Sequence, residues 1–185
     1  MPYKAPRVPF VDSREKLPKD QRHNYDRIAE SRGGISGPFG VLLNSPEVAG
    51  RTGHLGAYIR FESVLPGDVR ELAILTTARE HDCAFEWAYH EPIAREEGVS
   101  GSIIDVVKNR DSVDDLDKRE ASIVRYGREL FSENAVSDRT FQIVNEWLEE
   151  TGVTELTATF GYYSMIAVVL NALEVRPDEE APFPV

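Results

Sequence analysis

Apolar residues recur three and four positions apart over most of the chain, and runs that alternate apolar and polar residues are few. This spacing puts apolar side chains on one face of an α-helix, so the sequence predicts an all-α protein. We expect helices over residues 19–32, 45–64, 66–79, 83–98, 102–108, 116–131, 138–150 and 154–173. The last of these is apolar nearly all round between residues 160 and 170, which is typical of a central, buried helix.

Capping residues indicate where these helices begin and end. Ser45 followed by Pro46 is typical of a helix start, and Gly98 stands where a glycine commonly ends a helix. Asp82 precedes Cys83 and is expected to be the N-cap of the helix that begins there.

The domain organisation follows from the proline-rich ends. Residues 1–18 lack helical periodicity and are expected to form an extended N-terminal arm, and residues 176–185 a C-terminal tail. Residues 19–175 are expected to form a single all-helical domain. The polar, acidic stretch 109–117 separates two groups of helices, and a weak internal echo between residues 69–72 and 153–156 allows two related halves.

Charge and composition exclude several classes of partner. The chain has 185 residues and a formal net charge of -11, so it repels nucleic acid and anionic lipid. The N-terminus lacks the apolar stretch of a secretory signal, and no apolar run approaches the roughly 20 residues of a membrane span. The single cysteine, Cys83, excludes an intrachain disulfide, which fits a reducing compartment, and we expect a cytoplasmic protein.

Three reactive side chains share one face of the helix expected over residues 83–98. Glu86 and His90 are four positions apart and Cys83 precedes Glu86 by three. A carboxylate and an imidazole in this arrangement can divide the work of proton transfer. Cys83 near a helix N-terminus is expected to have a lowered thiol pKa. The same spacing also occurs on solvated helix faces, and a lone cysteine is often a small buried apolar residue.

The stretch around these residues resembles the core motif of the carboxymuconolactone decarboxylase and alkylhydroperoxidase D (AhpD) superfamily. In the peroxidase branch a glutamate is followed, about a dozen residues later, by Cys-x-x-Cys-x-x-x-His. Glu71 matches that glutamate, Cys83 the first cysteine and His90 the histidine, while Glu86 stands where the second cysteine would be. In the decarboxylase branch a glutamate four positions before the histidine is usual, and Glu86 with His90 fits it.

The resemblance implies an all-helical, AhpD-like bundle with Glu71, Cys83, Glu86 and His90 as the catalytic group, assembled as a homotrimer or homohexamer. A dithiol redox cycle requires a second thiol, which this chain lacks. The leading hypothesis is therefore non-redox acid–base catalysis on a small organic acid or lactone: a decarboxylation, or a related lyase, isomerase or hydrolase step, with no cofactor. The alternatives are a peroxidase or reductase that uses Cys83 alone, and a non-catalytic oligomeric binding protein.

Two further residues are candidates for substrate binding. His54 lies between Gly53 and Gly56 on the helix expected over residues 45–64, where small neighbours allow close approach of a ligand, and Trp87 adjoins the catalytic group. His81 is expected on the surface. We expect no metal, although Glu86 and His90 with a third ligand such as His54 would be an alternative.

Overall fold

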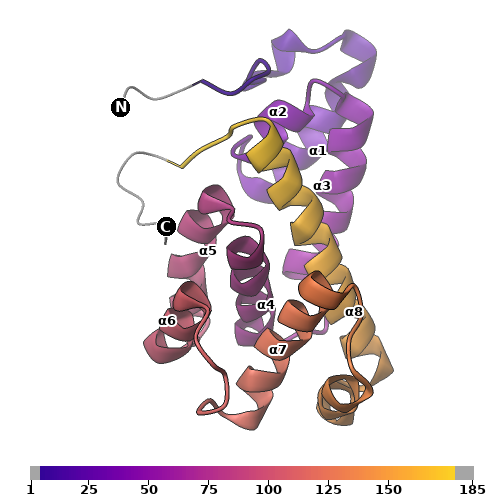
Figure 1. Cartoon of the computed structure of the whole chain (residues 1–185). Coiled ribbons are helices and arrows are strands. Elements are labelled where there is room, and N and C mark those ends of the chain that lie inside the picture. The colour runs from indigo at the N-terminus through magenta and orange to yellow at the C-terminus, as the bar shows by residue number, and fades with distance from the viewer. Residues whose placement is uncertain (1–4, 178–185) are drawn as a thin grey trace. The chain divides into compact units, whose positions relative to one another are not determined.

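The computed structural model describes residues 5–177, and over these residues it contains eight α-helices and no strand (Figure 1). This confirms the prediction of an all-α fold. The helices are α1 Arg22–Arg32, α2 Pro38–Leu42, α3 Pro46–Phe61, α4 Gly67–Glu80, α5 Ala84–Glu96, α6 Gly101–Asn109, α7 Lys118–Glu133 and α8 Asp138–Ala172, with short 3-10 turns at Arg14–Lys16 and Lys19–Gln21.

The chain divides into two compact units. Of the described residues, unit 1 contains 5–63 and 168–177, and unit 2 contains 64–167. The acidic stretch 109–117 joins α6 to α7 inside unit 2, so it does not separate two halves as the sequence suggested. Both segments of the weak internal echo also fall in unit 2.

Unit 1 is built around α1 and α3, and the N-terminal arm belongs to it. Val11 and Leu17 of the arm are buried in the same apolar cluster as Ile28 of α1. The backbone N–H of Val11 donates to the carbonyl of Gly40 at 2.8 Å. The described part of the arm is therefore packed against the helices of its own unit. Of the predicted C-terminal tail, only residues 176 and 177 are described.

Unit 2 is built around α4, which packs against α5, α6 and α7 (Figure 1). Every residue of α4 from Glu71 to Arg79 is buried, so this helix lacks a solvent face. The sequence predicted that residues 160–170 of α8 are central and buried, and this is correct for only one side of the helix. Gly161 and Met165 of α8 are exposed, because α8 buries one side only while α4 has neighbours on several sides.

The helix ends follow the sequence signals with one exception, the start of α5. Gly98 has a φ of 99° just past α5, which confirms the predicted glycine stop. Asp82 does not cap α5: Cys83 is the N-cap residue, and Asp82 has a φ of 47° in the turn before it. The two helices expected over 138–150 and 154–173 are both present in α8, which consists of two helices joined across a kink at Glu149, where φ is 57° and ψ is -177°.

The α8 segment is also long and apolar enough to cross a membrane by length and composition, which the sequence analysis had not anticipated. Half of its most apolar 18-residue window is buried within the protein. A core helix that packs against other helices has the same properties, and the burial of Phe160 and Ile166 shows such packing.

Candidate active site

The structure brings Glu71 of α4 together with Glu86 and His90 of α5. His90 Nδ1 lies 2.7 Å from Oε2 of Glu71, and His90 Nε2 lies 3.4 Å from Oε2 of Glu86. Glu71 is 1% exposed, His90 2% and Glu86 4%. One imidazole is thus held between two carboxylates in a buried site, and we call these three residues the Glu–His–Glu group.

The local fold explains this convergence. Glu86 and His90 are one turn apart on α5, as their spacing predicted, and α4 supplies Glu71 because α4 and α5 form the most extensive helix pair of unit 2. The connection between the two helices is only three residues long, from residue 81 to residue 83, so the helices return side by side.

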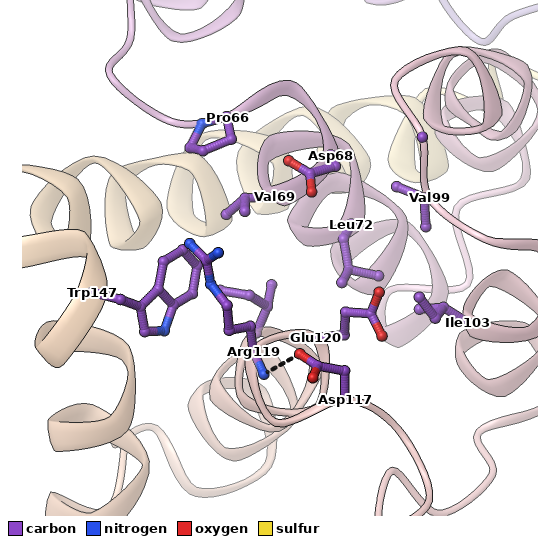
Figure 2. Close-up of a pocket in the computed structure, with 12 residues that line it drawn as sticks. Pro66, Asp68, Val69, Leu72, Val99, Ile103, Asp117, Arg119, Glu120 and Trp147 are labelled. Atoms are coloured by element: carbon purple, nitrogen blue, oxygen red, sulfur yellow. Dashed lines mark hydrogen bonds between the residues drawn. The ribbon is translucent and has the colours of Figure 1, made fainter.

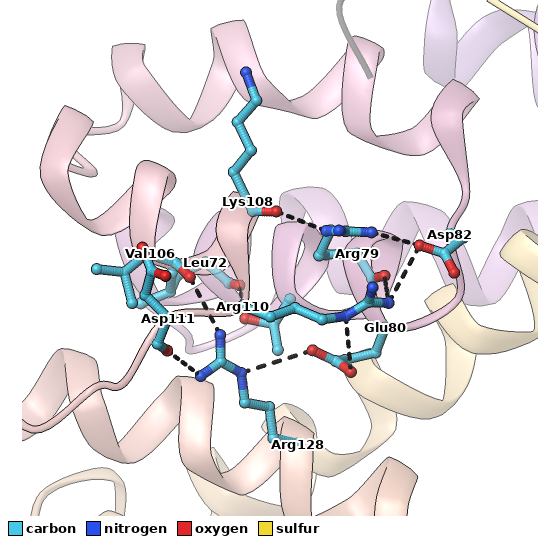
Figure 3. A network of polar contacts seen from close by, with 10 residues as sticks. Leu72, Arg79, Glu80, Asp82, Val106, Lys108, Arg110, Asp111 and Arg128 are labelled. Carbon is cyan, nitrogen blue, oxygen red and sulfur yellow. Dashed lines mark hydrogen bonds and ion pairs between the residues drawn. The ribbon is translucent and has the colours of Figure 1, made fainter. Parts of the chain in front are cut away.

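A network of charged residues holds this connection in place (Figure 3). Asp82 accepts hydrogen bonds from Arg79 and Arg110, and Glu80 forms ion pairs with Arg110 and Arg128 at 3.7 and 3.6 Å. Arg79 also donates to the carbonyl of Lys108 in α6 at 2.7 Å. Both arginines contact Oδ1 of Asp82, and this residue lies in the turn before α5 and does not cap the helix.

The two carboxylates control the charge of His90. Burial alone lowers the pKa of an imidazole, but the hydrogen bonds to Glu71 and Glu86 and the charges of both carboxylates outweigh it and raise the pKa of His90. An ionised carboxylate only accepts hydrogen bonds, so Nδ1 carries the proton that faces Glu71. The second proton of the imidazolium sits on Nε2, toward Glu86.

Arg70 and Glu97 extend the Glu–His–Glu group, and the sequence analysis missed both roles. Arg70 Nε lies 3.4 Å from Oε1 of Glu71, and another guanidinium nitrogen lies 3.5 Å from Oε1 of Glu97. The side chain of Arg70 is 14% exposed and that of Glu97 42%, so the charges alternate from the protein surface to the buried imidazole. Arg70 contacts Oε1 of Glu71 and leaves Oε2 for His90.

Two tyrosines flank the imidazole, and neither was singled out from the sequence. The rings of Tyr163 of α8 and Tyr89 of α5 meet the His90 ring edge-on, with centroids 5.2 and 5.1 Å away. Tyr163 is buried, whereas Tyr89 is 45% exposed. Tyr89 is thus an exposed ring in contact with the buried His90.

Cys83 stands at the start of α5 but is fully buried, at 0% exposure. Burial raises the pKa of its thiol to about 12, and the negative charge of Glu86 raises it further. Hydrogen bonds from the backbone N–H groups of Glu86 and Phe85 lower the pKa but do not compensate. The expectation of a lowered pKa from the helix N-terminus is therefore wrong: desolvation outweighs the helix dipole.

The remaining candidates belong to the other unit or have other partners. His54 is in unit 1, where it lines a cavity of about 230 Å3 with residues of α1 and α3. Trp87 is 0% exposed in the core of unit 2, and its indole N–H donates to Glu91 at 3.1 Å. Over residues 5–177 no cluster of three or more His, Cys, Asp or Glu side chains is arranged to hold a metal ion.

His81 was expected on the surface but is half-buried. Its Nε2 lies 2.8 Å from the hydroxyl oxygen of Ser164, and its ring meets Phe131 edge-on with the centroids 4.9 Å apart. Burial lowers the pKa of His81, although the charges of Glu80 and Asp82 oppose this. The residue thus ties the end of α4 to α8 as a neutral imidazole.

Solved structures share this all-helical fold over nearly the whole length of the chain. An alkylhydroperoxidase AhpD core protein from Ralstonia eutropha JMP134, described as peroxidase-related, matches with a TM-score of 0.77 at 17% identity and covers 96% of this chain and 95% of its own. A peroxidase-related protein from Silicibacter sp. TM1040 matches with a TM-score of 0.73 at 14% identity, over 96% of each chain. The debrominase Bmp8 matches with a TM-score of 0.72 at 14% identity, over 95% of this chain and 94% of its own.

The sequence gives a second, independent comparison. Residues 46–129, which run from α3 into α7 and contain Glu71, Cys83, Glu86 and His90, match the model of the carboxymuconolactone decarboxylase family. No match is found among curated proteins. Over residues 46–129 the chain is therefore similar to the carboxymuconolactone decarboxylase family, in agreement with the motif resemblance.

Proposed function

We propose that the protein is an enzyme that uses the Glu–His–Glu group for proton transfer to or from a carbon atom of a small organic acid or lactone. The observation that carries the proposal is the buried imidazole held between Glu71 and Glu86, with a raised pKa. A general acid or base must hold its proton near the working pH and in a fixed direction, and both carboxylates serve that purpose.

In a decarboxylation, the bond between the carboxylate and the substrate carbon breaks, carbon dioxide leaves and the electron pair stays as an enolate. The imidazolium of His90 then delivers its Nε2 proton to that carbon, and the imidazole becomes neutral. Glu71 keeps the tautomer and orientation fixed through Nδ1, Glu86 orients Nε2 as a hydrogen-bond acceptor, and a proton from water restores the imidazolium after turnover. No redox step and no second thiol are required.

Thiol chemistry is the second candidate, and the environment of Cys83 speaks against it. The nucleophile in peroxide reduction is a thiolate, and a thiol with a pKa of about 12 is almost wholly protonated near neutral pH. A non-catalytic binding role is also less well supported. A protein that had lost its chemistry would be expected to expose the Glu–His pair to solvent, whereas these side chains are buried together.

The support for a small organic substrate comes from relatives. The family that matches residues 46–129 is named for decarboxylation of a lactone acid, and a structure of the debrominase Bmp8 with a cysteine-to-alanine substitution holds 2,3,4-tribromopyrrole. We carry over from these relatives only the size class of the substrate. Tyr89, exposed next to His90, marks the side from which such a molecule would approach.

The test is proton exchange at carbon. The protein is incubated in deuterated water with a panel of small lactones and β-keto acids, and deuterium incorporation or loss of carbon dioxide is followed by NMR. We expect turnover on a member of this panel that falls at least about a hundredfold in His90→Asn and Glu86→Gln, since general acid–base groups contribute on that order. Glu96→Gln, an exposed carboxylate on the same helix, is the control.

Two results would contradict the proposal. The first is a panel on which the wild-type protein gives neither exchange nor decarboxylation. The second is peroxide reduction with an external thiol that disappears in Cys83→Ala and persists in His90→Asn, which would favour the thiol alternative.

We also propose that the protein assembles as a homotrimer or homohexamer. The support is a row of apolar side chains that α3 exposes to solvent, which is unfavourable unless another surface covers them. They are Val48 at 48%, Leu55 at 48%, Tyr58 at 41% and Phe61 at 58% exposure. Light scattering coupled to gel filtration gives the molar mass directly, and a mass of 20.8 kDa would refute the proposal.

A further inference from the structure

Arg70 lies beside a buried group whose own charges do not balance. Glu71 and Glu86 contribute two carboxylates, His90 contributes one positive charge when both of its nitrogens are protonated, and all three residues are buried. An uncompensated charge away from water is costly, so a group of this kind is stabilised by a further cation. Arg70, the neighbour of Glu71 on α4, is placed to provide it.

Arg70 and His90 share the carboxylate of Glu71. Arg70 Nε donates to Oε1 at 3.4 Å, and the arginine side chain is 14% exposed, so water screens this contact only in part. His90 Nδ1 faces the other oxygen, Oε2, at 2.7 Å. Because one negative charge is divided between two cations, each of them weakens the attraction of the other to the carboxylate.

Glu97 contacts the guanidinium of Arg70 from the side of the solvent. Its Oε1 lies 3.5 Å from Nη2 of Arg70, and Glu97 itself is the C-cap residue of α5. The carboxylate lies against the first residue of α4, where a Cβ atom on Gly67 would overlap with Oε2 and the carboxyl carbon of Glu97. The end of α5 thus reaches Arg70 through a space that residue 67 leaves open because it is glycine.

Asp68, the acidic residue in the first turn of α4, has a different location. It lines a cavity of about 230 Å3 together with Asp117 and Glu120 (Figure 2). Arg70 does not line this cavity, and its ion pairs are those with Glu71 and Glu97. Asp68 is exposed and two positions away from Arg70, so it serves as a matched control for the loss of one negative charge near the start of α4.

We propose that Arg70 is a positioning residue of the Glu–His–Glu group: it draws the negative charge of Glu71 away from His90, and Glu97 keeps its guanidinium in place. Without Arg70 the imidazolium would hold its proton more tightly. An acid of that kind transfers its proton slowly, since acid–base groups work best with a pKa near the working pH. The catalytic meaning of this inference rests on the proposed function, but the effect on His90 is measured without a substrate.

The test is the pKa of His90, followed by NMR titration of the full-length protein labelled with carbon-13 at histidine. The variants keep the side chains that face the ring, which are Glu71 from α4, Glu86 and Tyr89 from α5 and Tyr163 from α8. Arg70→Met removes the charge, and we expect the pKa of His90 to rise by about one pH unit, as for unit charges on the order of 8 Å apart in a partly buried setting. Arg70→Lys restores the charge and should return the pKa most of the way to the wild-type value.

Two variants test the contribution of Glu97. Glu97→Gln removes its charge, whereas Gly67→Ala keeps the charge and displaces the carboxylate from Arg70. Both release the guanidinium to act on Glu71, so we expect each to lower the pKa of His90 by about 0.3 pH units, the size of a partly exposed ion pair. Asp68→Asn and Arg95→Met remove exposed charges of either sign and should shift this pKa by less than about 0.1 pH units, because solvent and salt screen them.

The sign and size of these shifts decide the matter. An unchanged or lowered pKa of His90 in Arg70→Met, a lysine variant that behaves like the methionine variant, or an equal shift in the Arg95 control would overturn the inference. If Arg70→Met does not fold, Glu97→Gln at the surface is decisive, and a shift no larger than that of Asp68→Asn overturns it. The proposed function fails separately, on its substrate panel: the expected shifts without any turnover would support the role of Arg70 and contradict that function.

Discussion

Replacing Glu71 by glutamine tests whether a carboxylate sets the charge of His90. Glu71→Gln keeps the size of the side chain and removes the charge at the atom 2.7 Å from His90 Nδ1. A hydrogen bond to a charged group contributes about 1.5–3 kcal/mol, which corresponds to a change of about one to two pH units in a pKa. We therefore expect the pKa of His90 to fall by that amount. In the variant, burial still lowers this pKa, and only Glu86 remains to raise it.

The measurement is an NMR titration of protein labelled with carbon-13 at histidine, which has four such residues. His90→Asn identifies the resonance of His90 by its absence, and Glu96→Gln, exposed on the same helix, controls for the loss of one negative charge at longer range. An unchanged or raised pKa of His90 in Glu71→Gln would refute the reasoning. So would an equal decrease in the Glu96 control.

The same substitution has a signature in stability. His90 has a folded-state pKa above its ordinary value of 6.5, so its interaction with Glu71 contributes stability that is fully present below that value. The contribution is lost as the pH rises through the folded-state pKa. Denaturant unfolding should therefore show the largest difference between wild type and Glu71→Gln on the acidic side and a smaller one in alkaline buffer. A difference that grows with pH would contradict the assignment of the proton to His90.

Three further predictions concern packing and backbone. Cys83 should react with an aromatic disulfide reagent slowly in the folded protein and rapidly in denaturant at about pH 8, since it is fully buried and its pKa is about 12; equal rates would show that the thiol is accessible. Gly127→Ala should lower the free energy of unfolding by about 1–3 kcal/mol, because the new methyl group would lie 2.6 Å from an atom of the Phe160 ring. Gly161→Ala, which has nothing within 4 Å, should raise it slightly in the same urea titration. Glu149→Gly should stabilise by about 1 kcal/mol because it relieves a conformation that is nearly restricted to glycine, whereas Glu150→Gly, one residue further in regular helix, should destabilise by about the same amount.

The sequence predicted the helices well because their ends carry local signals. Gly98 adopts the left-handed conformation its residue type favours, and Pro46 stands at the first position of α3 after Ser45. The break in α8 falls at Glu149, which carries no such signal, although Gly152 lies three residues beyond. A glutamate with a φ of 57° is held there by its surroundings, and a local pattern contains no information on them.

The contacts of the candidate site that join residues close in the sequence were predictable, and those between distant segments were not. Glu86 and His90 face the same way because four residues make one helical turn, so their pairing follows from spacing alone. The contact of Glu71 with His90 depends on how α4 packs against α5, and the family motif supplied it where periodicity did not. Arg70 and Tyr163 reach the group through tertiary packing only, and both were missed.

Cys83 shows how magnitudes reverse a qualitative argument. Its place at the start of α5 predicted a stabilised thiolate, and a helix N-terminus contributes typically about 0.3–1 kcal/mol to such a charge. The difference between an ordinary pKa of 9.0 and about 12 corresponds to about 4 kcal/mol against the thiolate. Burial next to the carboxylate of Glu86 thus exceeds the dipole severalfold. At His90 the charged form is favoured instead, because two carboxylates more than compensate for the desolvation of the imidazolium. The two residues share a helix face, and the environment places the transferable proton on the imidazole while it keeps the thiol neutral.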